Sequence, residues 1–373
     1  MKKRIKIEKI IIESRKDDYY IAVDIGKRNC VVCITDKDGS VLEETKYDNT
    51  LQDAERFASN LNKKYSNRKC HAVCESTANM WLKTYEAFEK YGIDVKLANP
   101  LKTKAIAEAR IKTDKLDART LAHLLRSNLI AESYIAPNNV REDRSLLQLR
   151  INLVSDRTRV MNRVHSLLDK YDLKCKYEHI FGVNGIRWLK NIELKGNDQI
   201  QLVNYIHNIE FLNSEIKQIE KQISVEASQN ENVKILMSMT GIDYFSAMLI
   251  SSEIGDISRF RTAGKLVSWC GLCPTVHQSG NSMYMGRMKK DGNKKINWIM
   301  IQAANTASRT DNDRLKKYYK KIAKKHGHHV AITHVANKMI RIMWSMLTYK
   351  QLYNERKKEL YETKLKKIQS KIR

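Results

Sequence analysis

The sequence predicts an α/β domain followed by a mainly helical remainder. Two observations support this fold class. Between residues 19 and 99, short β-rich runs alternate with helical patterns. Over residues 141–228 there is no Pro, and apolar residues recur at helical spacing among many charged ones. The 373 residues, 42% of them apolar, are enough for two or three separate cores.

The elements of the first domain begin with a meander of strands. The β-rich runs cover 19–26, 30–36 and 41–47, and the Asp38-Gly39 pair predicts a hairpin between the second and third. The following elements alternate: a helix over 51–64, a strand over 71–75, a helix over 79–91, a strand over 93–99, and a helical stretch from Pro100 to about residue 128. This is the order of the ribonuclease H fold, in which the first and fourth strands are neighbours, and we expect that topology.

The remainder of the chain is predicted to be helical. Heptad-like runs over 146–168 and 201–223 predict two long helices, packed on each other or on another subunit as a coiled coil. Further helices are expected over 233–239, 243–253, 294–309 and 330–349, with a Gly- and Ser-rich stretch over 270–293. The expected domains are a basic extension (1–18), the ribonuclease H-like domain (19–140), the coiled-coil region (141–228), a mainly helical C-terminal domain (229–349) and a basic helix or tail (350–373).

The charge indicates a polyanionic partner. Lys and Arg number 68 against 42 acids, a net charge of +26, and the basic residues recur along the whole chain. Such an excess favours nucleic acid, because Lys and Arg displace its condensed counterions; a merely solvated basic surface is the alternative. No apolar run approaches the ~18–20 residues of a membrane helix, and no signal peptide is evident, so we expect a cytoplasmic protein without membrane contact.

Seven cysteines include two C-x-x-C pairs, Cys30/Cys33 and Cys270/Cys273, which together resemble a zinc ribbon. Cys30 and Cys33, however, lie in a strand-like run, where residues three apart face opposite sides. We therefore interpret these cysteines as buried thiols rather than metal ligands.

Four carboxylates occur where a catalytic metal site is expected. Asp24 ends the first strand and Glu75 the fourth, while Asp114 and Asp117 in KTDKLDA open a helix on one face. In the ribonuclease H topology all four converge, and clustered carboxylates require cations. Mg²⁺ fits their hard oxygen ligands, with Mn²⁺ as the alternative, and two ions ~3.5–4 Å apart would clamp a phosphodiester exchange.

Each acid also has a purely structural interpretation. Asp24 is then a turn residue, Asp114 caps its helix, and Asp117 pairs with Lys115 or Arg119. The occurrence of acids at two strand ends and at one helix start, in topological order, favours the metal site.

Motifs in the C-terminal domain match a known family. They are EIGDI with Arg259-Phe260, GLCP (271–274), Gln278-Ser279-Gly280, and Lys290 with Gly292-Asn293. Residues 254–303 with these motifs resemble the C-terminal domain of DEDD-type insertion-sequence transposases, recombinases that carry a catalytic serine and are guided by a bridge RNA. The four N-terminal acids match that family's RuvC-like quartet in order.

The resemblance implies a mechanism and partners. The quartet binds Mg²⁺, and Ser279, at the family's serine position, attacks DNA to form a phosphoserine link. One subunit's quartet meets another subunit's serine in a homodimer or homotetramer. A structured RNA pairs with donor and target DNA, and the bound protein associates with the nucleoid. Ser282 is the fallback nucleophile, and an ordinary loop serine is the structural alternative.

The sequence departs from the family at Thr240-Gly241-Ile242-Asp243, where the family tends to have Pro-Gly-Ile-Gly. Asp243 would repel phosphate, so we do not expect a phosphate-binding hairpin there. Two other functions stay open: a metal-dependent nuclease or junction resolvase that uses the carboxylates alone, and a non-catalytic nucleic-acid-binding protein. The extension and the tail either bind RNA or are simply solvated.

Overall fold

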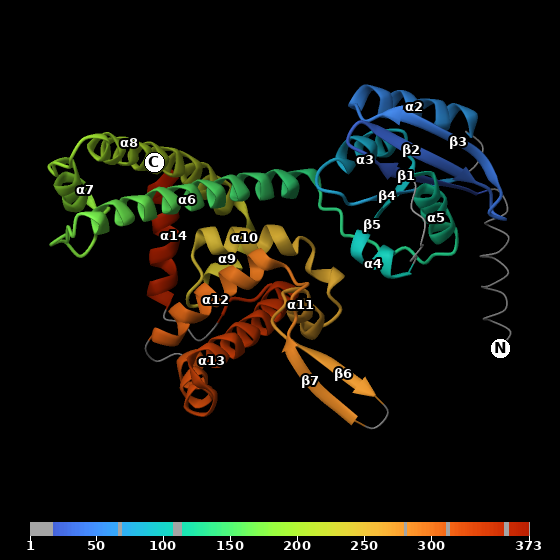
Figure 1. The fold of residues 1–373 in the computed structure, drawn as a ribbon. Coiled ribbons are helices and arrows are strands. Elements are labelled where there is room, and N and C mark those ends of the chain that lie inside the picture. The colour runs from blue at the N-terminus through green and yellow to red at the C-terminus, as the bar shows by residue number, and fades with distance from the viewer. Residues whose placement is uncertain are drawn as a thin grey trace. The chain divides into compact units, whose positions relative to one another are not determined.

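The chain forms two compact units, Met1–Ile135 and Ala136–Arg373, in the computed structural model (Figure 1). The structure describes residues 18–65, 69–106, 114–279, 282–310, 314–353 and 358–372. The predicted basic extension (1–18) lies outside these residues except for its last position. No helix within the described ranges combines the length and apolar character needed to cross a membrane.

The first unit contains a five-stranded sheet in the order β3-β2-β1-β4-β5. Its strands are β1 (Tyr19–Ile25), β2 (Asn29–Thr35), β3 (Val41–Asp48), β4 (Cys70–Glu75) and β5 (Asp94–Ala98). The first three are antiparallel, whereas β4 runs parallel to β1 and β5 parallel to β4. The predicted α/β domain is therefore confirmed, and its first and fourth strands are neighbours as in the ribonuclease H fold.

The β2–β3 hairpin forms at the predicted Asp38-Gly39 turn. Gly39 has a φ of +92°, a conformation that L side chains rarely adopt. The carboxylate of Asp36 accepts hydrogen bonds from the backbone N–H groups of Asp38 and Ser40, both at 2.9 Å. This local network sets the turn and hence the register of β2 against β3.

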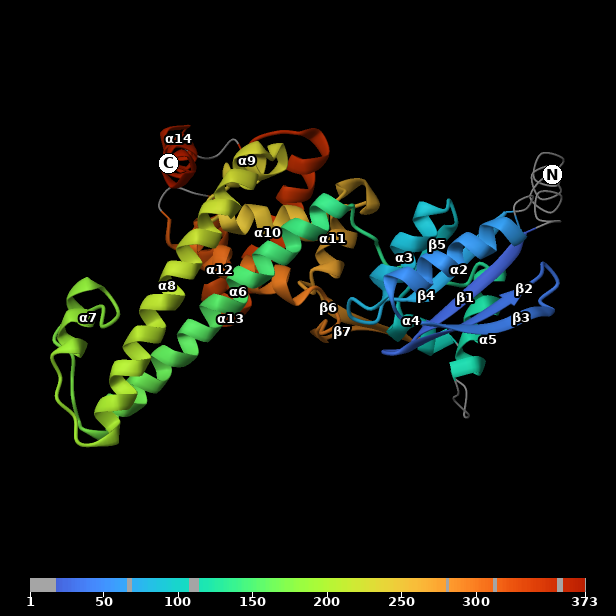
Figure 2. The same ribbon diagram turned by 90° about the horizontal axis from the view of Figure 1, so that it is seen from above.

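Helices cover both faces of the sheet. One core packs α2 (Leu51–Lys64) and α3 (Trp81–Lys90) against residues such as Ile21 and Val23, and the other packs α5 (Asp114–Arg126) against Tyr20 and Ala22. Alternate residues of β1 thus enter opposite cores, as strand geometry requires, and Figure 2 shows α2 and α5 on either side of the sheet. Helix α4 (Pro100–Ile106) follows β5.

The two C-x-x-C cysteines of this unit also lie on opposite faces. Cys30 belongs to the core beneath α2 and α3, and Cys33 to the core beneath α5. Both are buried. Their interpretation as buried thiols is confirmed.

The second unit begins with two long helices that pack side by side, α6 (Asn138–Lys170) and α8 (Asn197–Gln229) (Figure 2). A small core that includes Val164, Leu168 and Ile206 joins them to α7 (Val183–Lys190). The two predicted helices are thus packed against each other, and their coiled-coil character stays a prediction. Their other ends enter the C-terminal core through Leu147 and Ile223.

The C-terminal part surrounds one buried helix. Its elements are α9 (Glu231–Met237), α10 (Tyr244–Ile254), η1 (Ile257–Arg259), α11 (Ala263–Trp269), β6 (Pro274–Ser279), β7 (Ser282–Met288), α12 (Lys294–Arg309), α13 (Arg314–Tyr349) and α14 (Lys358–Ile372). Every residue of α10 is buried, because α10 lies inside the core rather than on it.

The structure contains a β6–β7 hairpin in the C-terminal domain, which was predicted to be mainly helical. Its antiparallel strands project from the helices (Figure 1). The Gly- and Ser-rich stretch over 270–293 therefore contains a two-stranded ribbon, for which no strands were predicted.

Helix α14 shows that the predicted basic tail packs on the second unit. Lys364 Nζ donates to the carbonyl oxygens of Met237 at 2.8 Å and Met239 at 3.0 Å. Lys371 Nζ donates to Glu220 at 2.6 Å, and Ile368 is buried in the core. These two lysines bind groups of the second unit, so the tail is not purely solvated.

Candidate active site

Three of the four predicted carboxylates line one pocket of about 180 Å³ in the first unit: Asp24, Glu75 and Asp117. The sheet brings the first two together, because β1 and β4 are parallel neighbours whose register pairs Val23 with Cys74, the residues just before them. Helix α5 brings the third, because Ala118 and Leu121 are buried against β1. The expected convergence at the strand ends is thus found for these three residues.

The fourth carboxylate, Asp114, begins helix α5, one turn before Asp117. Its side chain lies outside what the structure describes. Arg119, which the structural interpretation offered as a partner for Asp117, pairs instead with Glu44 of β3. Asp117 itself lines the pocket.

Polar groups other than acids also line this pocket. Thr103 of α4 is buried, and its hydroxyl has no hydrogen-bond partner among the described residues. Lys104 contributes an ammonium group and Thr120 a second hydroxyl. An unsatisfied buried hydroxyl beside three carboxylates suits a bound water or phosphate oxygen.

The pocket's donors fit a hard divalent cation. Carboxylate oxygens are the ligands that Mg²⁺ and Mn²⁺ prefer, and Mg²⁺ usually keeps several waters besides one or two carboxylates. Within the described ranges, no three His, Cys, Asp or Glu side chains converge tightly enough to enclose an ion. Three carboxylates that line one pocket suit a cation that keeps several water ligands.

The neighbouring thiols are poor competitors as ligands. Burial raises the pKa of the Cys74 thiol to about 12, and the charges of Cys30 and Glu75 act in the same direction. Burial also raises the pKa of Cys30, with a further contribution from the carboxylate of Asp24. Only a thiolate binds metal well, so a cation in the pocket would be held by oxygen.

The predicted nucleophile, Ser279, is the last residue of β6 in the second unit. The hairpin register pairs it with Ser282, the fallback candidate, at the first position of β7. The structure describes the backbone of both serines. Both candidates therefore lie at the far end of the projecting hairpin. This hairpin belongs to the second unit of the chain, whereas the carboxylates belong to the first.

The base of the hairpin is anchored by a buried acid. Glu253, only 7% exposed, accepts hydrogen bonds from Asn293 Nδ2 at 2.8 Å and Lys295 Nζ at 3.0 Å. The backbone N–H of Asn293 donates to the carbonyl of Trp269 at 2.8 Å. Motif residues from EIGDI and Gly292-Asn293 thus meet and fix the chain that leaves β7.

Other motif residues have structural roles nearby. Arg259 Nε donates to the carbonyl of Ile254 at 2.8 Å, and its guanidinium lies 4.3 Å and 4.8 Å from the ring centres of Phe260 and Trp269. Asp243 caps α10, where its carboxylate accepts from the backbone N–H of Ser246 at 2.8 Å. The residue that departs from the family pattern thus serves as a helix cap.

Sequence reasoning missed the hairpin and the two α4 residues of the pocket. A signal for the hairpin exists, because the Gly280-Asn281 pair between β-rich runs is a recognised turn sequence. For Thr103 and Lys104 there is no comparable signal. Only the packing of α4 beside the strand ends brings them to the carboxylates.

Comparisons with known proteins agree with these motifs. A family model for DEDD transposases, described as "Transposase", matches residues 21–172, and a model described as "Transposase IS116/IS110/IS902 family" matches residues 233–320. The transposase for insertion sequence element IS1111A of Coxiella burnetii is 26% identical over 368 residues, which cover 94% of this chain and 95% of that protein. The transposase for insertion sequence element IS1328 of Yersinia enterocolitica is 20% identical over 347 residues, which cover 90% and 98%.

Proposed function

We propose that this chain, which belongs to the IS110/IS116 family of transposases, breaks and rejoins DNA strands with a metal site and a serine nucleophile. In this proposal the carboxylates of the first unit hold divalent cations, and Ser279 of the second unit attacks the DNA backbone. The observation that supports it most is the shared pocket of Asp24, Glu75 and Asp117.

The carboxylates are proposed to act as metal ligands. A DEDD transposase domain suggests dependence on a divalent metal, and we propose Mg²⁺ held by Asp24, Glu75 and Asp117 together with Asp114. Bound there, the metal would supply Lewis-acid polarisation of a phosphate and a lower pKa for a nearby hydroxyl. Thr103 and Lys104 lie where they would contact the phosphate oxygens of the strand in the pocket.

Ser279 is proposed to be the nucleophile. Its Oγ forms a bond to the backbone phosphorus while one phosphorus–oxygen bond to deoxyribose breaks. The hydroxyl proton leaves to solvent, the released deoxyribose oxygen takes up a proton, and the DNA is held as a phosphoserine ester. In rejoining, a deoxyribose hydroxyl of another strand displaces the serine oxygen, so no oxidant or external energy source is needed.

Target choice is proposed to come from a structured guide RNA that pairs with donor and target DNA. The net charge of +26 supports a large nucleic-acid partner, and the family resemblance suggests its kind. In line with the family resemblance, we propose that one subunit's carboxylates act with another subunit's serine in a homodimer or homotetramer.

The serine mechanism is tested by trapping a covalent protein–DNA adduct on a pre-nicked substrate with Mg²⁺. Ser279→Ala should form no adduct and lose at least ~10³-fold in strand transfer, as expected when a nucleophile is removed. Ser282→Ala, its cross-strand neighbour, is the matched control and should retain both. Asp24→Asn should abolish cleavage as well as adduct formation.

The alternative function gives a different pattern. A nuclease or junction resolvase that uses only the carboxylates requires Ser279→Ala to cleave DNA like wild type while Asp24→Asn does not. Guidance is tested separately, by sequencing the RNA that copurifies and by repeating recombination after RNase digestion. Unchanged recombination after digestion would exclude a guide RNA.

A further inference from the structure

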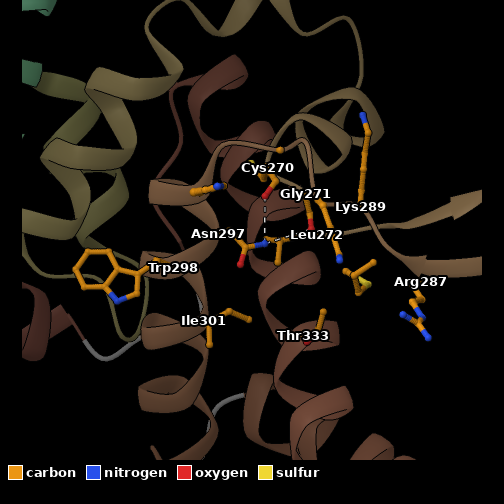
Figure 3. A pocket seen from close by; sticks show the side chains of 13 residues that line it. Cys270, Gly271, Leu272, Arg287, Lys289, Asn297, Trp298, Ile301 and Thr333 are labelled. Atoms are coloured by element: carbon orange, nitrogen blue, oxygen red, sulfur yellow. Dashed lines mark hydrogen bonds between the residues drawn. The ribbon is translucent and has the colours of Figure 1, made fainter. Parts of the chain in front are cut away.

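A second pocket, of about 600 Å³, lies at the base of the β6–β7 hairpin in the second unit (Figure 3). It is lined by the turn after α11, the end of β7, the chain that follows β7, helix α12 and one residue of α13. In the view of Figure 3, Trp298 and Arg287 lie at opposite sides, with Leu272 and Ile301 between them. This pocket shares no lining residue with the carboxylate pocket of the first unit.

The wall of this pocket is preformed. Gly271 has a φ of +68°, and a Cβ on Gly292 would lie 2.3 Å from the backbone nitrogen of Gly271. Asn297 Nδ2 donates to the carbonyl oxygens of Cys270 and Gly271 at 3.3 Å and 3.2 Å. The backbone around Gly271 is therefore held by close contact with Gly292 and by hydrogen bonds from Asn297, so a ligand would meet a rigid surface there.

An aromatic ring is exposed in the pocket. Helix α12 buries Ile296, Ile299 and Met300 in the core, yet Trp298 on the same helix is 45% exposed and lines the pocket. The Trp298 ring contributes a large planar surface to a lining that also includes the apolar residues Leu272 and Ile301. Such a surface suits a flat aromatic ligand.

The same pocket is lined by several basic side chains. Arg287, Lys290 and Lys294 line it, and no acid among the described residues forms an ion pair with any of them. Lys289 is different, because it pairs with Asp291 at 3.4 Å. A pocket that combines an aromatic surface with three such cations suits a ligand with both an aromatic ring and a phosphate.

We propose that this pocket binds one unpaired nucleotide of a nucleic acid strand. The base stacks on Trp298, and the adjoining phosphates contact Arg287, Lys290 and Lys294. A pocket of about 600 Å³ is within the usual range for small-molecule ligands. In a continuous duplex the base faces are covered by neighbouring pairs, so the ligand is a single-stranded or unpaired position. This inference rests on the proposed function only in taking nucleic acid as the substrate.

The test uses the full chain and fluorescence anisotropy in EDTA, where no metal-dependent chemistry occurs. The probes are labelled six-nucleotide single strands of DNA and of RNA, and a duplex of the same sequence. Trp298→Ala should weaken single-strand binding by about 10-fold, the typical effect of losing one stacked base. Its effect on duplex binding should be less than twofold. Lys294→Gln should weaken binding of all probes by a few-fold.

Two variants control for side-chain loss elsewhere. Tyr349→Ala removes an aromatic residue that is 61% exposed and does not line this pocket, and Lys367→Gln removes an exposed charge on α14. Both should bind like wild type, and thermal unfolding should show that Trp298→Ala is folded. If Trp298→Ala loses affinity only for the DNA strand or only for the RNA strand, that result identifies which nucleic acid supplies the nucleotide. Either result supports the proposal.

Single-strand affinities unchanged in Trp298→Ala would overturn the proposal, as would an equal loss for single strands and duplex. Failure of the serine mechanism would appear only in the adduct assay with Mg²⁺ and would leave these EDTA affinities as they are. The two proposals can therefore fail independently.

Discussion

Gly292 is a residue that has no room for a side chain. A Cβ there would come within 2.3 Å of the Gly271 backbone nitrogen and 2.4 Å of its Cα, and backbone atoms cannot yield cheaply. We expect Gly292→Ala to lower the free energy of unfolding by about 1–3 kcal/mol, the usual cost of overpacking. Urea unfolding followed by circular dichroism measures it.

Gly264 gives the matched control for this prediction. It lies in the first turn of α11, and its nearest neighbour to an added Cβ is 3.8 Å away. Gly264→Ala should therefore be neutral or stabilise by up to ~1 kcal/mol, because Ala loses less entropy than Gly in a helix. Equal unfolding midpoints for the Gly292→Ala variant and wild type would contradict the close contact.

Residues at the ends of strands were predictable from local sequence. Asp24 and Glu75 follow buried β-rich runs, so their position at one edge of the sheet requires only the strand order. Thr103 lines the same pocket, but its role depends on where α4 lies after β5. No periodicity in the sequence carries that information, because the packing of a short helix is set by tertiary contacts.

In helix α6, the surroundings of Asp143 disfavour the ionised form of its carboxyl group. Burial and then the nearby charges of Glu226 and Glu142 raise the pKa of Asp143 to about 6. A raised carboxyl pKa means that the folded state binds the proton more tightly than the unfolded state. Stability from this group is therefore complete below about pH 4 and is lost as the pH rises through 6.

Asp143→Asn should accordingly raise the free energy of unfolding at pH 7 by about 1–2 kcal/mol, a value reduced for the partial exposure of the group. At pH 4 the variant and wild type should unfold alike. Glu142→Gln, at an exposed position on the same helix, should change stability by less than ~0.5 kcal/mol at pH 7. Equal stabilities of Asp143→Asn and wild type at both pH values would show that the carboxyl is well solvated.

Helix α14 is attached through a lysine. Lys364 Nζ donates to the carbonyl oxygens of Met237, Met239 and Ile242, which lie at and beyond the end of α9. Lys364→Met keeps the aliphatic stem but leaves these acceptors without the cation. We expect a loss of about 2–3 kcal/mol in unfolding free energy, since hydrogen bonds from charged donors are stronger than neutral ones.

The exposed Lys367 on the same helix is the control, because Lys367→Met changes the same side chain without removing such contacts. It should unfold like wild type in a thermal denaturation experiment. If both variants lose equal stability, the Lys364 contacts have no special weight.

Elements with strong periodicity were predicted well, and the hairpin was not. The helices over 51–64 and 294–309 begin and end at the predicted residues, because apolar spacing and capping residues such as Thr50 and Asn293 mark them. In β6 and β7, by contrast, exposed residues such as Tyr284 and Met285 are consecutive and apolar. A projecting ribbon buries no consistent face, so the alternation that identifies a strand is weak.

At the scale of the whole molecule, the positive charge is divided between internal and surface uses. Lys364, Lys371 and Arg259 bind carbonyl or carboxylate groups of the protein itself. Lys290, Lys294 and Arg287 line a pocket instead. Composition alone gives the total of +26 but does not distinguish the two groups. The sequence therefore predicted the class of partner, and the structure indicates which cations are available to it.

This division predicts how binding responds to salt. If nucleic acid neutralises 6–10 of the surface cations, affinity for duplex DNA should fall by ~10³–10⁵-fold between 50 and 200 mM salt. Lys290→Gln and Lys294→Gln should each reduce the slope of log affinity against log salt by about one, because each would remove one of the proposed phosphate contacts. Lys364→Gln removes the same charge from an internal position and should leave the slope unchanged. Anisotropy titrations at four salt concentrations measure all three slopes, and an affinity independent of salt would mean that the basic surface is merely solvated.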